Sequence, residues 1–177
     1  MISATRDKNP KLKGLLDNEG DKMKTAIAYV SIRHGNTEKI AKAMANVLQA
    51  ELLRPEEVNA DTLSRVDLLG VGSGIYNSKH HERLFDMVDK LPTVKNRNAF
   101  IFSTSGWGEK RLEKYHEPLR SKLVGKGFNI IGEFTCFGLD TEGMLRLTGG
   151  ANKGRPNEED LKKAEEFART LQKKMTT

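Results

Sequence analysis

Residues 25–41 read TAIAYVSIRHGNTEKIA, and this stretch decides the fold of the 177-residue chain. Residues 25–31 are a short apolar run that ends at a turn containing glycine, which predicts a β-strand. Residues 38–50 place apolar side chains, Ile40 and Met44 among them, at the spacing of a helix. A strand followed directly by a helix is the opening unit of an α/β fold.

The same alternation continues along the chain. Further strands are predicted at residues 51–54, 67–73, 98–104 and 128–137. Further helices are predicted over residues 81–91, around 112–123 and over 161–171. Continuously apolar strands are typical of parallel sheets that helices cover on both faces. We therefore expect an α/β fold over residues 23–177, with a three-layer, doubly wound sheet of five parallel strands.

The composition excludes several classes of function. The chain has 30 basic and 24 acidic residues, a net charge of +6, and both signs are spread along it. Nucleic-acid binding needs positive charge gathered on one face or helix, so a mixed surface and no nucleic-acid partner are expected. The positive field still favours anionic ligands or an acidic partner surface. No run approaches the roughly 20 apolar residues of a membrane span, so no membrane association is expected.

Two further features concern the setting of the protein. The single cysteine, Cys136, excludes an intrachain disulfide and a multi-cysteine metal site, so a buried, inert thiol and a cytoplasmic location are expected. Residues 1–22 are polar and aperiodic, without the apolar segment of a secretory signal, which predicts a disordered leader. Met23 precedes the first strand directly, which raises the hypothesis that translation starts there. The oligomeric state is not predicted.

The loop after the first strand is a candidate anion site. In open parallel sheets, ligands bind beyond the carboxyl ends of the strands, where the strand order reverses. This loop leads into a helix whose first N–H groups lack intrahelical partners, and its glycine, its polar residues and its two basic residues suit a phosphate. The alternative is an ordinary turn with a side-chain cap. The candidate contacts are Ser31, Arg33, His34, Gly35, Asn36 and Thr37.

The sequence Gly35-Asn-Thr-Glu-Lys-Ile-Ala41, after a predicted strand, resembles the phosphate-binding loop of the flavodoxin family. The order of the predicted elements over residues 23–171 also fits that family. The resemblance implies an FMN cofactor, with its phosphate in this loop and its isoalloxazine ring at the loops after the third and fourth strands. The chain departs from the family at Ile32, Arg33 and His34, where hydroxyl residues are usual, and Arg33 or His34 is expected to supply positive charge instead.

The loop after the third strand flanks the flavin ring, if the resemblance holds. It implies that the tyrosine lies against the ring, with packing on its own loop as the alternative, and that Gly74 or a neighbouring peptide faces the flavin N5. The sequence Gly70-x-Gly-x-Gly74 lacks the third glycine of a dinucleotide fingerprint and is not on the first strand, which argues against that motif. The candidate contacts are Ser73, Gly74, Ile75, Tyr76 and Asn77.

The loop after the fourth strand carries the only tryptophan of the chain, between two glycines. A tryptophan outside an apolar run is more typical of a site or an interface than of a core. The resemblance implies that backbone N–H groups of this loop bond the pyrimidine edge of the flavin. The candidate contacts are Thr104, Ser105, Gly106 and Trp107, and no catalytic or metal-ligating residue is predicted.

Two other segments give no specific prediction of function. Residues 138–156 form a long, glycine-rich loop, typical of a lid, a partner site or a mobile surface loop. Within it, residues 149–154 lack the lysine and hydroxyl residue of a phosphate-binding P-loop. His80 and His81 are expected to be solvated residues at the start of a helix.

Together these features favour an FMN-binding, flavodoxin-like electron-transfer protein that serves a redox partner protein or a small-molecule acceptor. One alternative is an FMN-dependent oxidoreductase acting on a small molecule, and another is a cofactor-free, flavodoxin-like interaction module. A phospho-receiver domain of the same topology is disfavoured, because it needs acidic residues where the chain has Ser31 and Ser73.

Overall fold

The computed structural model describes residues 23–141, 147 and 149–176. Its sheet has the strand order β2-β1-β3-β5-β6, and all neighbours on this path are parallel. The strands are β1 (Thr25–Val30), β2 (Glu51–Leu53), β3 (Leu68–Tyr76), β5 (Arg97–Ser105) and β6 (Phe128–Phe137). The predicted five-stranded parallel sheet is therefore confirmed, while the predicted leader lies outside the described residues.

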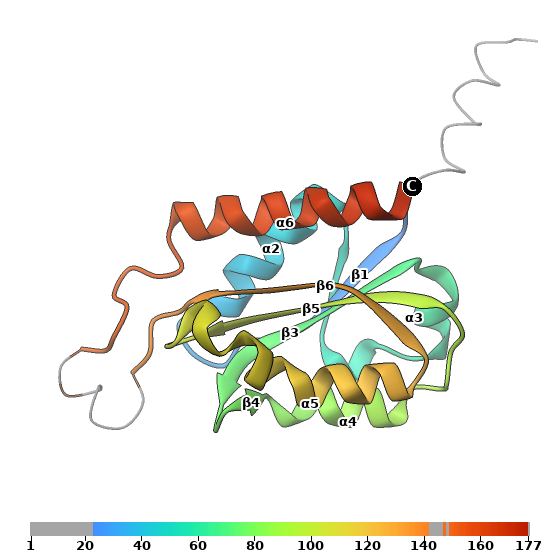
Figure 1. The fold of residues 1–177 in the computed structure, drawn as a ribbon, viewed down its shortest axis with the longest axis horizontal. Coiled ribbons are helices and arrows are strands. Elements are labelled where there is room, and N and C mark those ends of the chain that lie inside the picture. The colour runs from blue at the N-terminus through green and yellow to red at the C-terminus, as the bar shows by residue number, and fades with distance from the viewer. Residues whose placement is uncertain (1–22, 142–146, 148, 177) are drawn as a thin grey trace, which may run out of the picture.

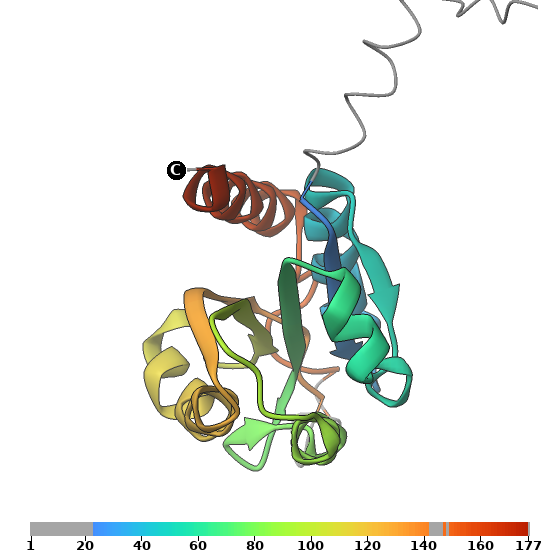
Figure 2. The same cartoon turned by 90° about the vertical axis from the view of Figure 1, so that its right-hand side faces the viewer.

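Helices cover both faces of the sheet, as Figures 1 and 2 show. The two helices on one face are α2 (Asn36–Leu48) and α6 (Glu158–Thr176). Those on the other face are α3 (Ala60–Arg65), α4 (Glu82–Lys90) and α5 (Leu112–Gly125). Pro118 lies inside α5, and the short 3₁₀ turns η1 (Pro55–Glu57) and η2 (Gly108–Arg111) precede α3 and α5. The three-layer arrangement is confirmed.

Each central strand contributes side chains to two separate cores. In β5, Ile101 belongs to the core under α4 and α5, whereas Phe100 and Phe102 belong to the core under α2 and α6. Burying such a side chain stabilises the fold by about 2–3 kcal/mol. The phenylalanine rings lie so close to β3 that a Cβ on Gly70 or Gly72 would come within 2.4 Å of them. These two glycines are therefore fixed by close packing in the sheet.

The sheet also contains a strand that the sequence did not predict. β4 (Lys79–His80) runs antiparallel to the end of β3, and a two-residue turn joins them. Both turn residues, Asn77 and Ser78, have positive φ angles of 49° and 64°, as the favoured turn of a tight hairpin requires. The hairpin places the β3 loop at the carboxyl end of the sheet, next to the point between β1 and β3 where the strand order reverses.

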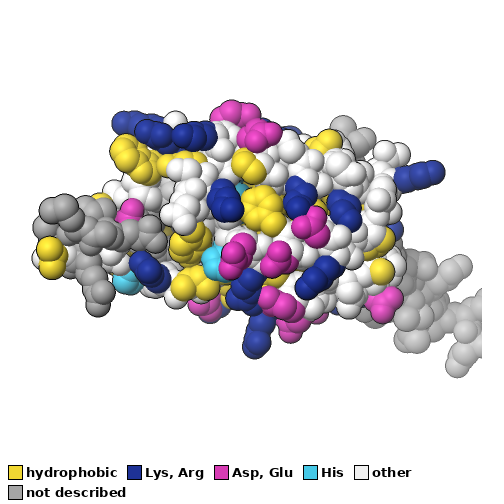
Figure 3. All heavy atoms as spheres, turned by 90° about the horizontal axis from the view of Figure 1, so that it is seen from below, with side chains coloured by type: hydrophobic (Ala, Val, Ile, Leu, Met, Phe, Trp, Pro, Cys, Tyr) yellow, Lys and Arg dark blue, Asp and Glu magenta, His cyan; other side chains and the backbone are white. Residues whose placement is uncertain are grey.

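None of the helices in the described part of the chain combines the length and the apolar character needed to cross a bilayer. On the face that carries α4 and α5, positive and negative side chains are intermingled (Figure 3). Among them, Lys122 pairs with Asp89, and Arg120 pairs with Glu113.

Candidate functional site

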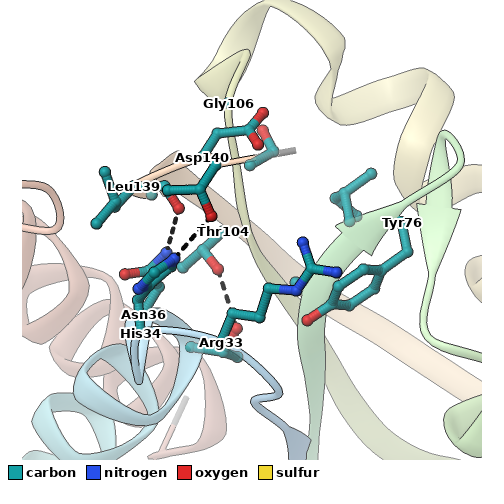
Figure 4. Close-up of a pocket in the computed structure, with 14 residues that line it drawn as sticks. Arg33, His34, Asn36, Tyr76, Thr104, Gly106, Leu139 and Asp140 are labelled. Carbon is teal, nitrogen blue, oxygen red and sulfur yellow. Dashed lines mark hydrogen bonds between the residues drawn. The ribbon is translucent and has the colours of Figure 1, made fainter. Parts of the chain in front are cut away.

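A pocket lies at the carboxyl ends of β1, β3 and β5 (Figure 4). Its cavity has a volume of about 70 Å³. The structure brings together residues from all three predicted loops. Those that line the pocket are Arg33, His34, Asn36, Thr37, Gly74, Ile75, Tyr76, Thr104, Ser105 and Gly106. The remaining predicted residues, which do not line it, are Ser31, Gly35, Ser73, Asn77 and Trp107.

The N-terminus of α2 opens toward this pocket without a side-chain cap. Gly35 is the N-cap residue with φ at 65°, and as a glycine it has no side chain with which to cap the first turn. By contrast, Asn59 caps α3 and His81 caps α4. The alternative prediction that Asn36 or Thr37 caps the turn is therefore wrong, because both residues lie inside α2. The first amides of α2 and its partial positive charge are left to a ligand or solvent.

The polar residues of the first loop tie it to its neighbours. Asn36 Nδ2 donates to the Leu139 carbonyl oxygen at 2.9 Å, and the hydroxyls of Thr37 and Thr104 lie 2.9 Å apart. His34 Nε2 lies 2.9 Å from the Thr141 hydroxyl. These contacts join the ends of three strands across the pocket.

Two residues of the same loop bring other properties to the site. The Arg33 side chain reaches across the pocket, with its guanidinium beside the Tyr76 ring (Figure 4). Ser31 Oγ is buried and has no hydrogen-bond partner among the described residues. The loop thus supplies positive charge at the pocket and an unsatisfied hydroxyl close behind it.

The β3 loop forms the second wall. Tyr76 lines the pocket and also packs edge-on against His81, with ring centroids 5.3 Å apart. Beyond Tyr76 lies a second hollow of about 290 Å³, which Asn77 lines. Arg33 and Tyr76 line both cavities and so form the partition between them.

The β5 loop forms the third wall, without its tryptophan. Trp107 is 57% exposed and lies outside the pocket, where its ring centroid is 4.8 Å from the Arg111 guanidinium. The prediction that Trp107 contacts a flavin stays a prediction. An exposed ring stacked on a cation is equally suited to an interface.

A fourth wall, which the sequence did not predict, is formed by residues 138–141 directly after β6. The backbone of Asp140 pairs with that of Ala151, and Asn152 donates to the Gly106 carbonyl oxygen at 3.1 Å. A Cβ on Gly106 would come within 2.6 Å of the Asp140 carboxylate, so this carboxylate lies directly against the β5 loop. The length of the glycine-rich loop was the one sequence signal for this wall.

Two buried serine–histidine pairs lie beneath the pocket. Ser73 Oγ lies 3.0 Å from His80 Nδ1, and Ser103 Oγ lies 2.8 Å from His116 Nε2. The two histidine rings are in contact, with centroids 4.9 Å apart. The prediction that His80 is solvated is wrong, because the β3–β4 hairpin folds it into the interior, where it is fully buried. Burial, and then the neighbouring His116, hold the pKa of His80 well below its ordinary value.

Hydrogen bonds connect the second pair, Ser103 and His116, to charged residues near the surface. His116 Nδ1 lies 2.9 Å from Glu133 Oε2, and Arg120 donates to both oxygens of the same carboxylate. Burial alone raises the pKa of Glu133, but the hydrogen bonds from His116 and Arg120 outweigh it and lower that pKa to about 2. Ser103, His116 and Glu133 have the connectivity of a hydrolase triad. Ser103, however, is 1% exposed and bonds Thr135, so no substrate reaches its hydroxyl.

Cys136 in β6 is buried, as predicted. Its burial, with Asp160 nearby, raises the pKa of the thiol to about 12. The thiol is therefore protonated at neutral pH and does not act as a nucleophile.

Comparisons with known proteins agree with this architecture. A 151-residue stretch, 85% of this chain, is 48% identical to the uncharacterised protein MJ0298 of Methanocaldococcus jannaschii, over 99% of that protein. Flavodoxin 2 of Bacillus cereus superposes with a TM-score of 0.64 at 21% identity, over 85% of this chain and 99% of that one. A flavodoxin from the domain Archaea superposes with a TM-score of 0.63 at 17% identity, over 88% and 100%. At such identities the structural likeness concerns the fold.

The family is shown by the sequence itself. A model of the flavodoxin domain matches residues 26–145, which is more than half of the chain and includes all three predicted loops. The chain therefore belongs to the flavodoxin family.

Proposed function

We propose that this protein binds FMN at the carboxyl ends of β1, β3 and β5 and transfers electrons through it. The observation that carries the proposal is the uncapped N-terminus of α2, which opens into a pocket walled by the β3 and β5 loops. A helix N-terminus without a capping side chain suits a phosphate group. The adjoining walls offer Tyr76 and backbone groups of residues 104–106 to a flat ring.

The residues present fit the phosphate of FMN. The first-turn amides of α2 supply donors, and Asn36 and Thr37 add polar side chains at the pocket. Arg33 and His34 line the pocket and bring positive character where family members have hydroxyls. A dianionic group would accept from the α2 amides and pair with the positive charge of Arg33.

The ring requires more room than the pocket now has. A cavity of about 70 Å³ is far below the roughly 300 Å³ at which ligand pockets begin. The adjoining hollow of about 290 Å³ is separated from it by Arg33 and Tyr76. We infer that Arg33 swings aside when the flavin enters, since a long, flexible side chain moves at lower cost than the strand ends.

Bound FMN would supply the electron-transfer chemistry, and the protein supplies binding, orientation and tuning of the potential. The α2 amides hold the phosphate, Tyr76 shields one side of the ring, and residues 104–106 present backbone groups to its edge. The Arg33 charge near the ring favours the more negatively charged, reduced flavin. The electron acceptor is a partner protein or a small molecule.

Titration with two flavins tests the proposal. The measurement is the fluorescence of FMN, and separately of riboflavin, during addition of the purified full chain, followed by absorbance in the visible range. FMN is expected to bind at least a hundredfold more tightly than riboflavin, because the phosphate carries much of the recognition. Protein that binds neither flavin would refute the proposal and favour the cofactor-free interaction module. Equal affinities would refute the phosphate site at α2.

A further inference from the structure

A second cavity, the hairpin cavity, lies beside the pocket proposed for FMN. Its walls come from the β1 loop, the β3–β4 hairpin and the start of α4, and Figure 1 shows β4 leading into α4 beside the end of β3. Its volume of about 290 Å³ is close to the roughly 300 Å³ at which ligand pockets begin. Neither α2 nor residues 104–107 contribute to it. Its lining includes Ile32, Arg33, Tyr76, Lys79, His81 and Glu82.

Positive charge exceeds negative charge in the lining of the hairpin cavity. Arg33 and Lys79 contribute two cations, and Glu82 contributes the one carboxylate. Lys79 forms no ion pair with any residue that the structure describes, and its Nζ lies 5.9 Å from the centre of the Phe85 ring. A lysine without a carboxylate partner at the wall of a cavity attracts an anionic ligand.

A smaller cavity, of about 150 Å³ between η1 and α4, shows the opposite arrangement. Its two cations, Arg83 and Lys90, are matched by two carboxylates, Glu56 and Asp86. Arg83 donates two hydrogen bonds of 2.6 Å to Glu56. The protein supplies the counter-charge in this smaller cavity, whereas in the hairpin cavity it leaves Lys79 to a ligand.

The hairpin cavity also has flat and apolar walls. The rings of Tyr76 and His81 pack edge-on with centroids 5.3 Å apart, and Ile32 is 53% exposed. His81 Nδ1 accepts the N–H of Arg83 at 3.2 Å, so the hydrogen of this ring is on Nε2, which is a donor. A ligand that suits these walls combines a flat apolar body with a negatively charged group.

We propose that the hairpin cavity is a second ligand site, separate from the FMN pocket, for a small aromatic carboxylate. The carboxylate pairs with Lys79, and the ring of the ligand packs on the side of Tyr76 that faces away from the pocket. Arg33 lines both cavities, so it adds positive charge to the hairpin cavity also after it turns out of the pocket. Because Tyr76 separates the cavities, the second site does not depend on bound FMN.

Titration of the full chain with benzoate, and separately with uncharged benzamide, tests the proposal. The movement of backbone amide signals in ¹H–¹⁵N NMR spectra measures the affinity and also locates the ligand. Benzoate is expected to move the signals of Ile32, Lys79 and Glu82. It should bind at least about tenfold more tightly than benzamide, because only the carboxylate forms an ion pair. Equal affinities, or movements confined to other parts of the chain, would overturn the proposal.

Two lysine variants separate a local ion pair from the overall positive field. Lys79 and Lys90 are both exposed and each lines a surface cavity, but Lys90 lies at the other end of α4 from the hairpin cavity. Lys79→Gln should weaken the binding of benzoate about fivefold. Lys90→Gln should change it less than about twofold, because salt screens the longer distance. Equal losses in the two variants, or no loss in Lys79→Gln, would overturn the site.

The same titration of FMN-loaded protein distinguishes this site from the proposed function. Benzoate is expected to bind with an affinity within about threefold of that for the FMN-free protein, below the range of a coupled pair of sites. Displacement of benzoate by FMN would show that the hairpin cavity belongs to the flavin site, which overturns the second site and leaves the proposed function intact. Protein that binds benzoate but no FMN would refute the proposed function and support a separate second site.

Discussion

Ser73 and Ser103 lie side by side in the sheet, and their serine–histidine pairs differ in the group that each pair contacts next. They pair in register on β3 and β5, both are buried, and each contacts a buried histidine. The Ser73 pair ends at the Gly74 carbonyl beside the pocket. The Ser103 pair ends, through His116, at Glu133 near the surface.

The two pairs differ in how far their polar groups are satisfied. The Ser103 branch, which runs from Ser103 through His116 to Glu133, ends on charged groups, because His116 and Arg120 both bond the Glu133 carboxylate. Removing one of these partners would leave a buried polar group unpaired and so lower the stability of the fold. The Ser73 branch, which consists of His80, Ser73 and the Gly74 carbonyl, ends on a backbone oxygen in the wall of the pocket. It leaves Nε2 of His80 without a hydrogen-bond partner in the part of the chain that the structure describes. Incomplete satisfaction of a buried polar group is costly.

The largest effect is expected when the Ser103 branch loses its charged end. Glu133→Leu leaves the buried His116 Nδ1 hydrogen without an acceptor and removes one of two carboxylates from Arg120. The free energy of unfolding should fall by about 3 kcal/mol in urea denaturation. Glu51→Leu, which breaks the exposed pair with Arg65, should cost less than about 1 kcal/mol. Similar losses in the two variants would contradict the assignment of stability to this branch.

Acid should weaken the same branch in a defined pH window. The pKa of Glu133 is lowered from 4.5 to about 2 in the folded protein, so the carboxylate stabilises the fold fully above pH 4.5. This contribution is lost as the pH falls from 4.5 toward 2, because the folded protein then binds the proton less readily than the unfolded chain does. We expect a loss of about 2 kcal/mol, since partial exposure weakens the interaction. Urea denaturation at several pH values measures it, and Glu133→Leu should lack this component.

Much of the fold could be predicted, because its signals are local. Continuous apolar runs predicted four of the five parallel strands, and a weaker signal at residues 51–54 predicted the fifth. A glycine followed by Asn36 and Thr37 predicted a site at the end of the first strand, where the pocket lies. The helix α3 was not predicted, because its six residues are too few to show a helical period. Its capping residue, Asn59, was the available signal.

The features that were missed depend on distant contacts. β4 has two residues and its turn contains no glycine, so neither periodicity nor turn composition indicated the hairpin that buries His80. The wall formed by residues 138–141 joins the pocket from more than 100 residues beyond Asn36. Spacing along one chain carries no information about such contacts, which only the packed sheet creates.

Double-variant cycles would sharpen the contrast between the branches. Ser103→Ala and Glu133→Leu both act on His116, so their costs in unfolding free energy should deviate from additivity by about 1 kcal/mol. Ser73→Ala and Glu133→Leu share no hydrogen-bonded partner and should add within about 0.5 kcal/mol. Strong coupling in the second cycle would show that the ring contact between His80 and His116 joins the branches into one network.

The smallest effect on stability is expected at Trp107 in the β5 loop. Trp107→Ala removes a ring that is 57% exposed and whose stacking partner is the exposed Arg111, so the free energy of unfolding should change by about 0.5 kcal/mol or less. Tyr76→Ala removes a side chain that lines the pocket, and it should raise the dissociation constant of FMN about tenfold, against less than threefold for Trp107→Ala. Fluorescence titration of both variants measures the ratio. A larger loss of affinity in Trp107→Ala would mean that the β5 loop closes over the flavin and that the tryptophan contacts it. The pocket walls would then have to rearrange by more than the movement of the Arg33 side chain.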